Sequence, residues 1–172
     1  MTLSLCKRVG ILTCLAVLGT AISMLAQTRV AAPEAALPAV YQNWLDQDVA
    51  YIISDEERAQ FLAFADDKDR DNFVRAFWEK RNPSPGNREN AYKEEHYRRI
   101  AYANLHFASG HAGWATDRGK TYIVLGPPDQ ITTSREFDLP AEIWHYRSTP
   151  LTDGRDVKFV DRCKCGEFQL AP

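Results

Sequence analysis

The sequence predicts an α+β fold in which a helical N-terminal half packs on a small antiparallel β-sheet. Between residues 40 and 108, apolar side chains recur at three- and four-residue spacing, which is typical of helices that bury one face. After Gly113, short apolar runs are separated by Pro and Gly turns without an intervening helical period. Strands that follow one another in this way are expected to pair antiparallel.

The N-terminal segment has the layout of an export signal. Lys7 and Arg8 precede an uncharged run from Val9 to Ala26, which is typical of a Sec-type signal peptide cleaved after Ala26. The same run, residues 9–26, is long enough to stay in the inner membrane as an anchor. Residues 1–26 are therefore interpreted as a signal peptide or an N-terminal membrane anchor. The Ala/Pro-rich residues 27–39 are interpreted as a flexible tether.

The charge balance narrows the class of partner. Removal of Lys7 and Arg8 leaves 19 basic side chains against 23 acidic ones, a net charge of about −4. This balance argues against a nucleic acid partner, which would need a basic surface. We expect a periplasmic or secreted protein with a protein partner in the envelope. The membrane is expected to be contacted only through an uncleaved N-terminal segment.

The helical half begins with three short helices. The first is expected over residues 40–48. Ser54 and Glu57 form a capping box, in which each side chain bonds a free amide of the first turn, and this box opens the second helix. Asp66 or Asp67 is expected to cap the third helix.

The longest helix is expected over residues 87–108, with one apolar stripe that docks on the sheet. Residues 121–125 form a short run that is apolar on both faces, which predicts a central strand. Three further strands are expected at residues 143–147, 157–161 and 167–170. Together these elements form one domain, residues 40–171.

The joint between the two halves is the pentapeptide Gly113-Trp114-Ala115-Thr116-Asp117. Together with the similar spacing in residues 52–58, 77–83, 95–104, 113–129 and 142–146, it resembles the GWxTD-domain family of exported bacterial proteins. The resemblance covers nearly the whole mature chain and implies a module of the bacterial envelope. It implies no particular reaction, substrate or cofactor.

The pentapeptide and the arginine after it have two interpretations. In the structural one, Thr116 or Asp117 organises a turn, Gly119 takes a positive φ before the strand, and Trp114 fills the core. In the functional one, Trp114 stacks on a ligand whose polar end is held by charged side chains at the rim of a pocket. The candidate binding residues are Trp114, Thr116, Asp117, Arg118 and Asp129.

His96 lies within the apolar stripe of the longest helix. It is either a buried histidine bonded to a tyrosine or a backbone carbonyl, or a proton-transfer residue beside Asp117. The sequence contains no Gly-x-Ser-x-Gly elbow. The leading hypothesis is therefore an exported, non-catalytic module that binds a protein or ligand or acts as a scaffold. The alternative is an envelope hydrolase that uses His96, Asp117 and Arg118 in a shared cleft.

No cofactor and no metal are predicted, because the sequence has no phosphate-binding loop, haem motif or zinc-ligand spacing. His106, His111 and His145 do not combine with Cys163 and Cys165 into a known zinc pattern. The resemblance does not account for these two cysteines. In an extended strand they would lie ~6.6–6.8 Å apart, near the limit for a bridge. Free thiols and a tight disulfide in a turn both remain open.

Overall fold

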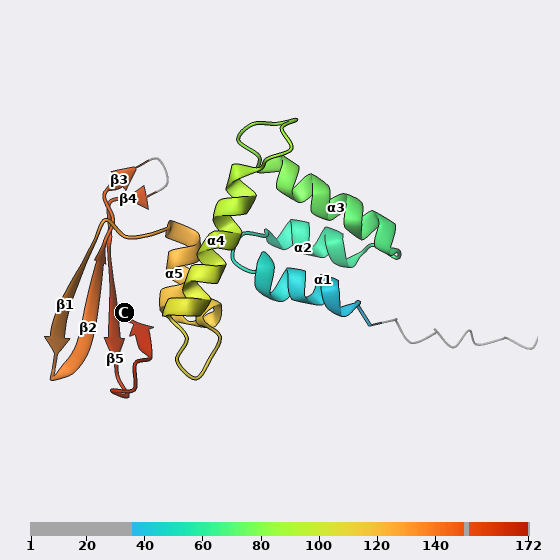
Figure 1. The fold of residues 1–172 in the computed structure, drawn as a ribbon. Helices are drawn as coiled ribbons and strands as arrows, with labels where there is room; N and C mark the ends of the chain where they lie inside the picture. The colour runs from blue at the N-terminus through green and yellow to red at the C-terminus, as the bar shows by residue number, and fades with distance from the viewer. Residues whose placement is uncertain (1–35, 150–151, 172) are drawn as a thin grey trace, which may run out of the picture. The chain divides into compact units, whose positions relative to one another are not determined.

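The computed structural model describes residues 36–149 and 152–171 (Figure 1). The predicted signal peptide or anchor lies outside the described residues, as does most of the tether. No helix within the described part of the chain is long and apolar enough to cross a membrane.

Within the described residues, four helical elements open the domain. The predicted capping box is confirmed. The Ser54 hydroxyl accepts a hydrogen bond from the Glu57 amide at 3.2 Å, and the Glu57 carboxylate accepts one from the Ser54 amide. The Asp66 side chain caps the next helix by accepting from the Asp69 amide at 2.9 Å. The elements are α1 (Ala39–Asn43), the π-helical turn η1 (Trp44–Asp48), α2 (Asp55–Leu62) and α3 (Asp67–Lys80).

These segments bury a cluster of mostly aromatic side chains, which we call the first core. Phe61 is fully buried at its centre, with the rings of Tyr41 and Trp44 5.8 and 5.0 Å away. Burial of large rings removes apolar surface from water and stabilises the fold. The first core consists of Tyr41, Trp44, Leu45, Val49, Phe61, Phe77 and Trp78.

Helix α4 (Ala91–His106) begins later than predicted. Asn90 caps it by accepting from the Lys93 amide at 3.0 Å, and the Asn90 amide group donates to the carbonyl oxygen of Trp78 at 2.7 Å. Because Asn90 is bonded on both sides, the helix starts at Ala91. Its later turns enter the second core, which consists of Ile100, Ala103, Phe107, Ile123, Trp144, Tyr146 and Phe159.

Residues 121–125 are helical, so the predicted central strand is wrong. They are the end of α5 (Asp117–Leu125), which stops at Gly126, where φ is +86°. Gly119 and Ile123 are buried one turn apart, whereas Val124 is exposed. This pattern is that of an amphipathic helix with one buried face.

The strands form a four-stranded antiparallel sheet in the order β1-β2-β5-β6, which confirms the α+β prediction. Strand β1 (Gln130–Glu136) was not predicted, and β2 (Leu139–His145) begins earlier than the predicted strand. The predictions for β5 (Asp156–Asp161) and β6 (Phe168–Leu170) are confirmed to within one residue at each end. The short strands β3 (Ser148–Thr149) and β4 (Thr152–Asp153) form a separate hairpin.

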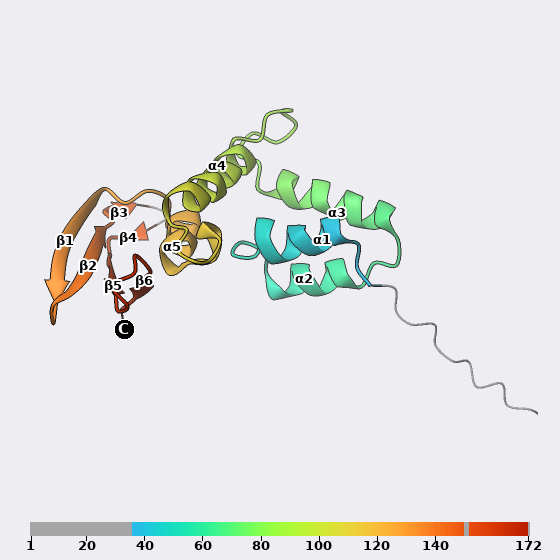
Figure 2. The ribbon, with the colours of Figure 1, turned by 60° about the horizontal axis from the view of Figure 1, so that its bottom comes forward.

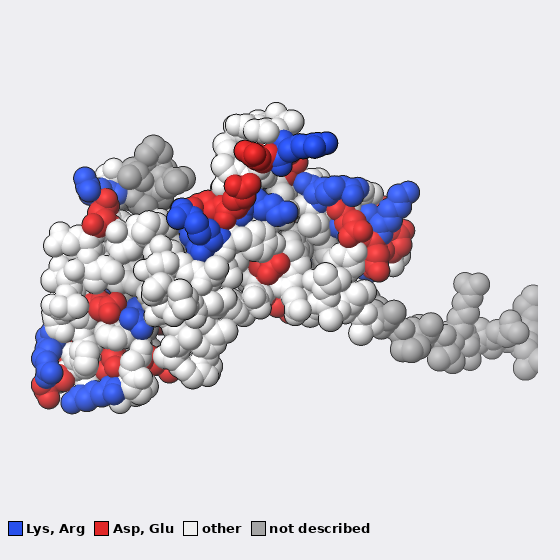
Figure 3. Space-filling view, in the orientation of Figure 1, with Lys and Arg blue, Asp and Glu red and all other residues white. Residues whose placement is uncertain are grey.

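Helix α5 lies between α4 and the sheet in both ribbon views (Figures 1 and 2). Trp144 of β2 and Phe159 of β5 are fully buried, with ring centroids 4.8 Å apart, and Phe107 lies 5.4 Å from Trp144. The second core is therefore built where the helical layer meets one face of the sheet. On the face of the molecule seen in Figure 3, acidic and basic side chains are interspersed.

Candidate functional site

Two glycines bring the backbones of α4, α5 and the turn η2 (Gly113–Ala115) into direct contact. A Cβ on Gly113 would lie 1.9 Å from the carbonyl oxygen of Ala103 in α4. A Cβ on Gly119 would lie 1.8 Å from the carbonyl oxygen of Gly113. Neither approach is possible for another residue. Gly119 has no positive φ, so the sequence interpretation of this glycine was wrong, and its role is close packing.

Thr116 is the N-cap of α5. Its buried hydroxyl accepts from the Gly119 amide at 3.1 Å and donates to the carbonyl oxygen of Gly113 at 2.8 Å. The first bond satisfies one of the free amides at the helix N-terminus. Thr116 therefore has both of its hydrogen-bonding roles filled within the fold.

Asp117 is the first residue of α5 and its side chain reaches across to β6. Oδ2 accepts from the Leu170 amide at 2.7 Å. A carboxylate at this position is also favoured by the partial positive charge of the helix N-terminus. Asp117 thus ties the last strand of the sheet to α5.

The Arg118 side chain is largely buried and contacts a carboxylate, a backbone carbonyl oxygen and two aromatic rings. Its guanidinium donates to Glu142 Oε1 at 3.2 Å and to the carbonyl oxygen of Gly166 at 3.1 Å. It also lies over the rings of Phe168 and Phe107, at 4.3 and 5.2 Å from their centroids. Such a planar cation between aromatic faces and a carboxylate is a strong anchor.

Trp114 is half-buried at the edge of the second core, so it does not plug the core completely. Its backbone amide donates to Asn104 Oδ1 at 3.0 Å, and its carbonyl oxygen accepts from the Tyr51 hydroxyl at 3.2 Å. The two rings lie 6.1 Å apart. Burial, together with the charge of Asp117, raises the pKa of Tyr51.

His96 belongs to a different environment. It is 4 % exposed, its Nε2 lies 2.6 Å from the carbonyl oxygen of Asp48, and its ring lies 5.6 Å from that of Trp78. Burial lowers the pKa of His96, so the neutral ring with a proton on Nε2 is favoured as the donor to Asp48. The interpretation as a buried histidine bonded to a backbone carbonyl is confirmed. Within the described part of the chain, the contacts of His96 do not include Asp117 or Arg118.

Asp129 closes the start of β1 against the end of β2. Its carboxylate accepts from the backbone amide of Arg147 at 2.7 Å and from Arg147 Nε at 3.0 Å, and the Asp129 amide donates to the carbonyl oxygen of His145. The hydrogen bond from the backbone amide of Arg147, together with the positive charge of the Arg147 side chain, lowers the pKa of Asp129. The side chain therefore serves a local backbone clamp.

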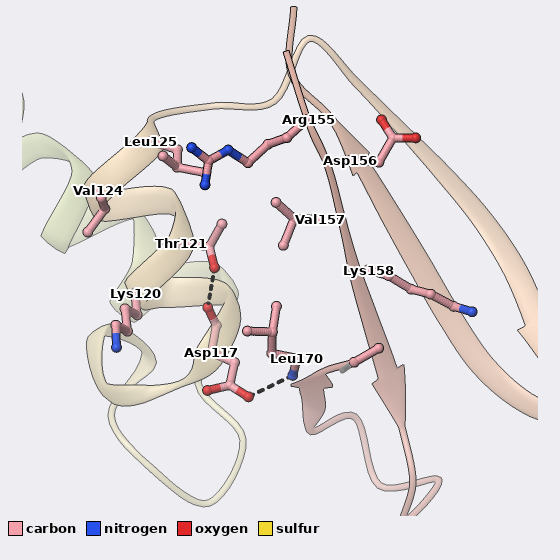
Figure 4. A pocket seen from close by; sticks show the side chains of 11 residues that line it. Asp117, Lys120, Thr121, Val124, Leu125, Arg155, Asp156, Val157, Lys158 and Leu170 are labelled. Atoms are coloured by element: carbon pink, nitrogen blue, oxygen red, sulfur yellow. Dashed lines mark hydrogen bonds between the residues drawn. The ribbon is translucent and has the colours of Figure 1, made fainter. Parts of the chain in front are cut away.

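A cavity of ≈ 400 Å³ lies between α5 and strands β5 and β6 (Figure 4); we call it the α5 cavity. Figure 4 shows the side chains of Asp156 and Lys158 directed away from it, where Asp156 pairs with His145 and Lys158 with Glu136. The side chains that shape it include Asp117, Lys120, Thr121, Val124, Leu125, Arg155, Val157 and Leu170.

Asp117 also lines a second cavity of ≈ 390 Å³, together with Thr116 and residues of β6. The sequence interpretation found the motif residues but missed the cavity walls. Thr121 and Val124 were missed because residues 121–125 were predicted to be a strand. The β5 wall could not be found from the sequence, since strand pairing brings it to α5 only in the folded chain.

One group within the described residues has three potential metal-ligating atoms close together. These atoms, from Asp161, Cys163 and Cys165, lie within 4.8 Å of one another. The two cysteines are joined by a disulfide in the turn between β5 and β6, so their sulfur atoms are not thiolates in this form. Of the alternatives left open by the sequence, the structure has the tight disulfide.

Comparison with known proteins gives one result. The family model described as the GWxTD domain matches residues 23–169, most of the chain. No curated protein and no solved structure matches.

Proposed function

The chain belongs to the GWxTD domain family, and we propose that it is an exported module of the cell envelope that acts by binding rather than by catalysis. The binding site in this proposal is the α5 cavity. Its volume of ≈ 400 Å³ falls in the range of ligand pockets in proteins. The observation that carries the proposal is that this cavity lies beside the motif: Asp117 lines it, and Thr116 caps the helix that forms one of its walls.

The motif residues hold the walls of the cavity in place. Asp117 fixes Leu170 of β6 at the cavity edge, and Thr116 caps the helix that forms the opposite wall. A site of this kind needs rigid walls, because a partner then loses less conformational freedom on binding. In this proposal the motif is the support of a binding site.

The chemistry of the lining suggests the partner. Val124, Leu125 and Val157 offer apolar surface, whereas Figure 4 shows the Lys120 side chain directed away from the strands, with its ammonium 5.6 Å from the centroid of the Tyr51 ring. An extended protein segment or ligand that presents an apolar group matches this lining. We propose such a segment of an envelope protein as the partner.

The contacts of the polar motif side chains support binding over hydrolysis. A general base must reach the reacting proton and be oriented by a second group. The side chains of Thr116, Asp117 and Arg118 are bonded to the backbone or to Glu142. His96 is bonded to the backbone carbonyl oxygen of Asp48, beside the first core. The hydrolase alternative would require His96, Asp117 and Arg118 to converge.

Export in this proposal depends on the N-terminal segment. Lys7, Arg8 and the uncharged residues 9–26 would direct the chain across the inner membrane. Chains purified from the envelope are expected to begin near Gln27 by N-terminal sequencing. An uncleaved, membrane-bound chain would indicate the anchor instead, and a full-length chain found only in the cytosol would contradict export.

Site-specific photocrosslinking tests the binding site. Val124 is 46 % exposed in the α5 cavity and Leu62 is 51 % exposed on α2, so the two positions are matched in size and exposure. A photoreactive residue at 124 is expected to give a discrete adduct in envelope fractions, and one at 62 is not. In the chain that carries the photoreactive residue at 124, Leu170→Glu, with an unchanged melting temperature, is expected to abolish capture, because Leu170 also lines the α5 cavity and is 52 % exposed. Equal adducts at both positions would overturn the proposed site.

A further inference from the structure

The turn between β5 and β6 carries two exposed cysteines, Cys163 and Cys165, whose Cα atoms lie 5.2 Å apart in a disulfide. A disulfide stabilises a fold mainly by closing a loop, and this effect grows with the length of the loop. A bridge between residues two positions apart therefore adds little to the stability of the fold. Exposed disulfides are those that exchange with external thiols.

The buried carboxylate of Asp161 holds this turn together. Asp161 is 3 % exposed and accepts from the backbone amides of Cys165 at 3.1 Å and Gly166 at 2.8 Å. Arg118 supports the same turn by donating to the carbonyl oxygen of Gly166. These bonds involve no sulfur atom, so they can keep the two cysteines together when the bridge is open.

The surroundings make the two sulfur atoms unequal. Asp161 Oδ1 lies 3.3 Å from Sγ of Cys163. A carboxylate at this distance disfavours a thiolate on Cys163 and accepts a hydrogen bond from its thiol. Arg162 and Lys164 flank Cys163 in the sequence, and Lys164 also precedes Cys165, so both cations favour negative charge on the turn as a whole.

We propose that the Cys163–Cys165 bridge is a redox-active disulfide that oxidises a pair of thiols on an extended peptide or an unfolded protein. A substrate thiolate attacks Sγ of Cys165, a mixed disulfide forms, and the bond to Cys163 breaks. The Cys163 thiolate takes a proton from water and its S–H donates to Asp161. The second substrate thiolate then attacks the substrate sulfur of the mixed disulfide and releases Cys165.

The exchange is balanced within the two reactants. Two electrons pass from the substrate thiols to the bridge, one substrate disulfide forms, and the chain is left with two reduced cysteines. Each chain therefore oxidises one pair of thiols. No other oxidant takes part in this single exchange.

The test uses the full-length chain with Cys6→Ser and Cys14→Ser, so that the turn supplies the only cysteines. The probe is a synthetic peptide with two reduced cysteines. One equivalent of peptide disulfide per chain is expected, measured by mass spectrometry. The matched control, which also carries Cys163→Ser and Cys165→Ser, is expected to form none and to keep its melting temperature.

Single variants test the assignment of the two sulfur atoms. With Cys163→Ser, the remaining Cys165 is expected to form a mixed disulfide with oxidised glutathione about tenfold faster than Cys163 does in the Cys165→Ser chain. Asp161→Asn is expected to raise the alkylation rate of Cys163 at neutral pH, since the repelling charge is gone. A purely structural Asp161 would not change this pH profile.

Two results would overturn the proposal. One is peptide oxidation no faster than in the cysteine-free control although the chain is folded and the bridge is formed. The other is isolation of the chain with one zinc ion bound by reduced Cys163 and Cys165, because metal-bound thiolates are not free to form the bridge.

Discussion

The glycines at 113 and 119 allow backbones to approach closely, and the motif side chains of Thr116 and Asp117 form hydrogen bonds that hold the fold. Gly113 allows the turn η2 to touch the backbone of α4, and Gly119 allows α5 to touch η2. From the sequence, a positive φ was assigned to Gly119, because spacing alone could not distinguish a glycine needed for a positive φ from one needed for close packing. That distinction depends on which backbone lies opposite.

Gly113→Ala is expected to lower the free energy of unfolding by at least about 3 kcal/mol. The added Cβ would lie 1.9 Å from the carbonyl oxygen of Ala103, and neither backbone can move without shifting a helix. Urea denaturation measures the loss. Gly86→Ala is the control, because a Cβ there meets nothing within 4 Å and only the positive φ is strained, at a cost of about 1–2 kcal/mol. Equal losses in both variants would contradict the close-packing argument.

His96 should make stability depend on pH. Burial lowers the pKa of His96 in the folded chain below its value of 6.5 in an unfolded chain. Just below pH 6.5 the unfolded chain therefore binds more protons, so the free energy of unfolding should fall as the pH drops. The stability is fully present above pH 6.5. Glu57 acts in a separate pH range: its pKa is lowered from 4.5 to about 2, so the stability that its ionised carboxylate contributes is lost only as the pH falls below 4.5.

His96→Gln isolates this effect, because the amide can still donate to the carbonyl oxygen of Asp48 but does not titrate. The measurement is the change in the free energy of unfolding between pH 8 and pH 5.5. This change is expected to be smaller in the variant than in the parent chain. An identical change in both would show that His96 does not titrate differently on folding.

At the scale of elements, the helices were easier to predict than the strands. Capping side chains mark helix starts locally: the Ser54 cap was predicted correctly, and Asp66 was one of the two residues predicted for the next cap. Residues 121–125 were not, because Thr121, Ile123 and Val124 are β-branched and the run is too short to show a helical period. The cap at Thr116 and the close packing of Gly119 decide in favour of a helix.

The strand β1 was missed for a different reason. As an edge strand it is exposed along nearly its whole length, so its sequence shows no alternation of apolar and polar residues. The β5 wall of the α5 cavity could not be predicted either, since only strand order brings Val157 beside α5. The motif itself is local in sequence, whereas the cavity that it supports is not.

Thr116→Ala is expected to cost about 1–2 kcal/mol, the range for loss of an N-cap side chain. The variant loses the bond from the Gly119 amide and the bond to the carbonyl oxygen of Gly113. Thr116→Ser retains the hydroxyl and should recover most of the loss in urea denaturation. A serine variant as unstable as the alanine variant would assign the effect to packing of the threonine methyl group.

Asp117 links α5 to β6, and hydrogen exchange at the Leu170 amide reports on this link. Asp117→Asn keeps an acceptor oxygen and should cost roughly 1 kcal/mol or less, with the amide still protected. Asp117→Ala removes the acceptor and should accelerate exchange at Leu170. If Asp117→Asn instead left the fold and this protection intact but abolished a hydrolytic activity of the parent chain, Asp117 would be a catalytic residue.

For the whole molecule, the decisive feature is that one continuous helix serves both cores. The 16-residue α4 contributes His96 beside Trp78 of the first core, and Ile100 and Ala103 to the second core. Tyr97 packs against both cores and donates to Asp48 at 3.1 Å. Loss of either core therefore removes the support of half of α4.

Phe61→Ala tests whether the two cores unfold as one. Phe61 is fully buried in the first core, and its truncation should cost about 3–5 kcal/mol. If α4 couples the cores, hydrogen exchange followed by mass spectrometry should accelerate in β2 and β5 as much as in α2 and α3. Acceleration confined to α2 and α3 would show that the sheet and α5 remain folded when the first core opens. We expect the coupled result, because a helix half-stripped of its packing is too short to persist alone in water.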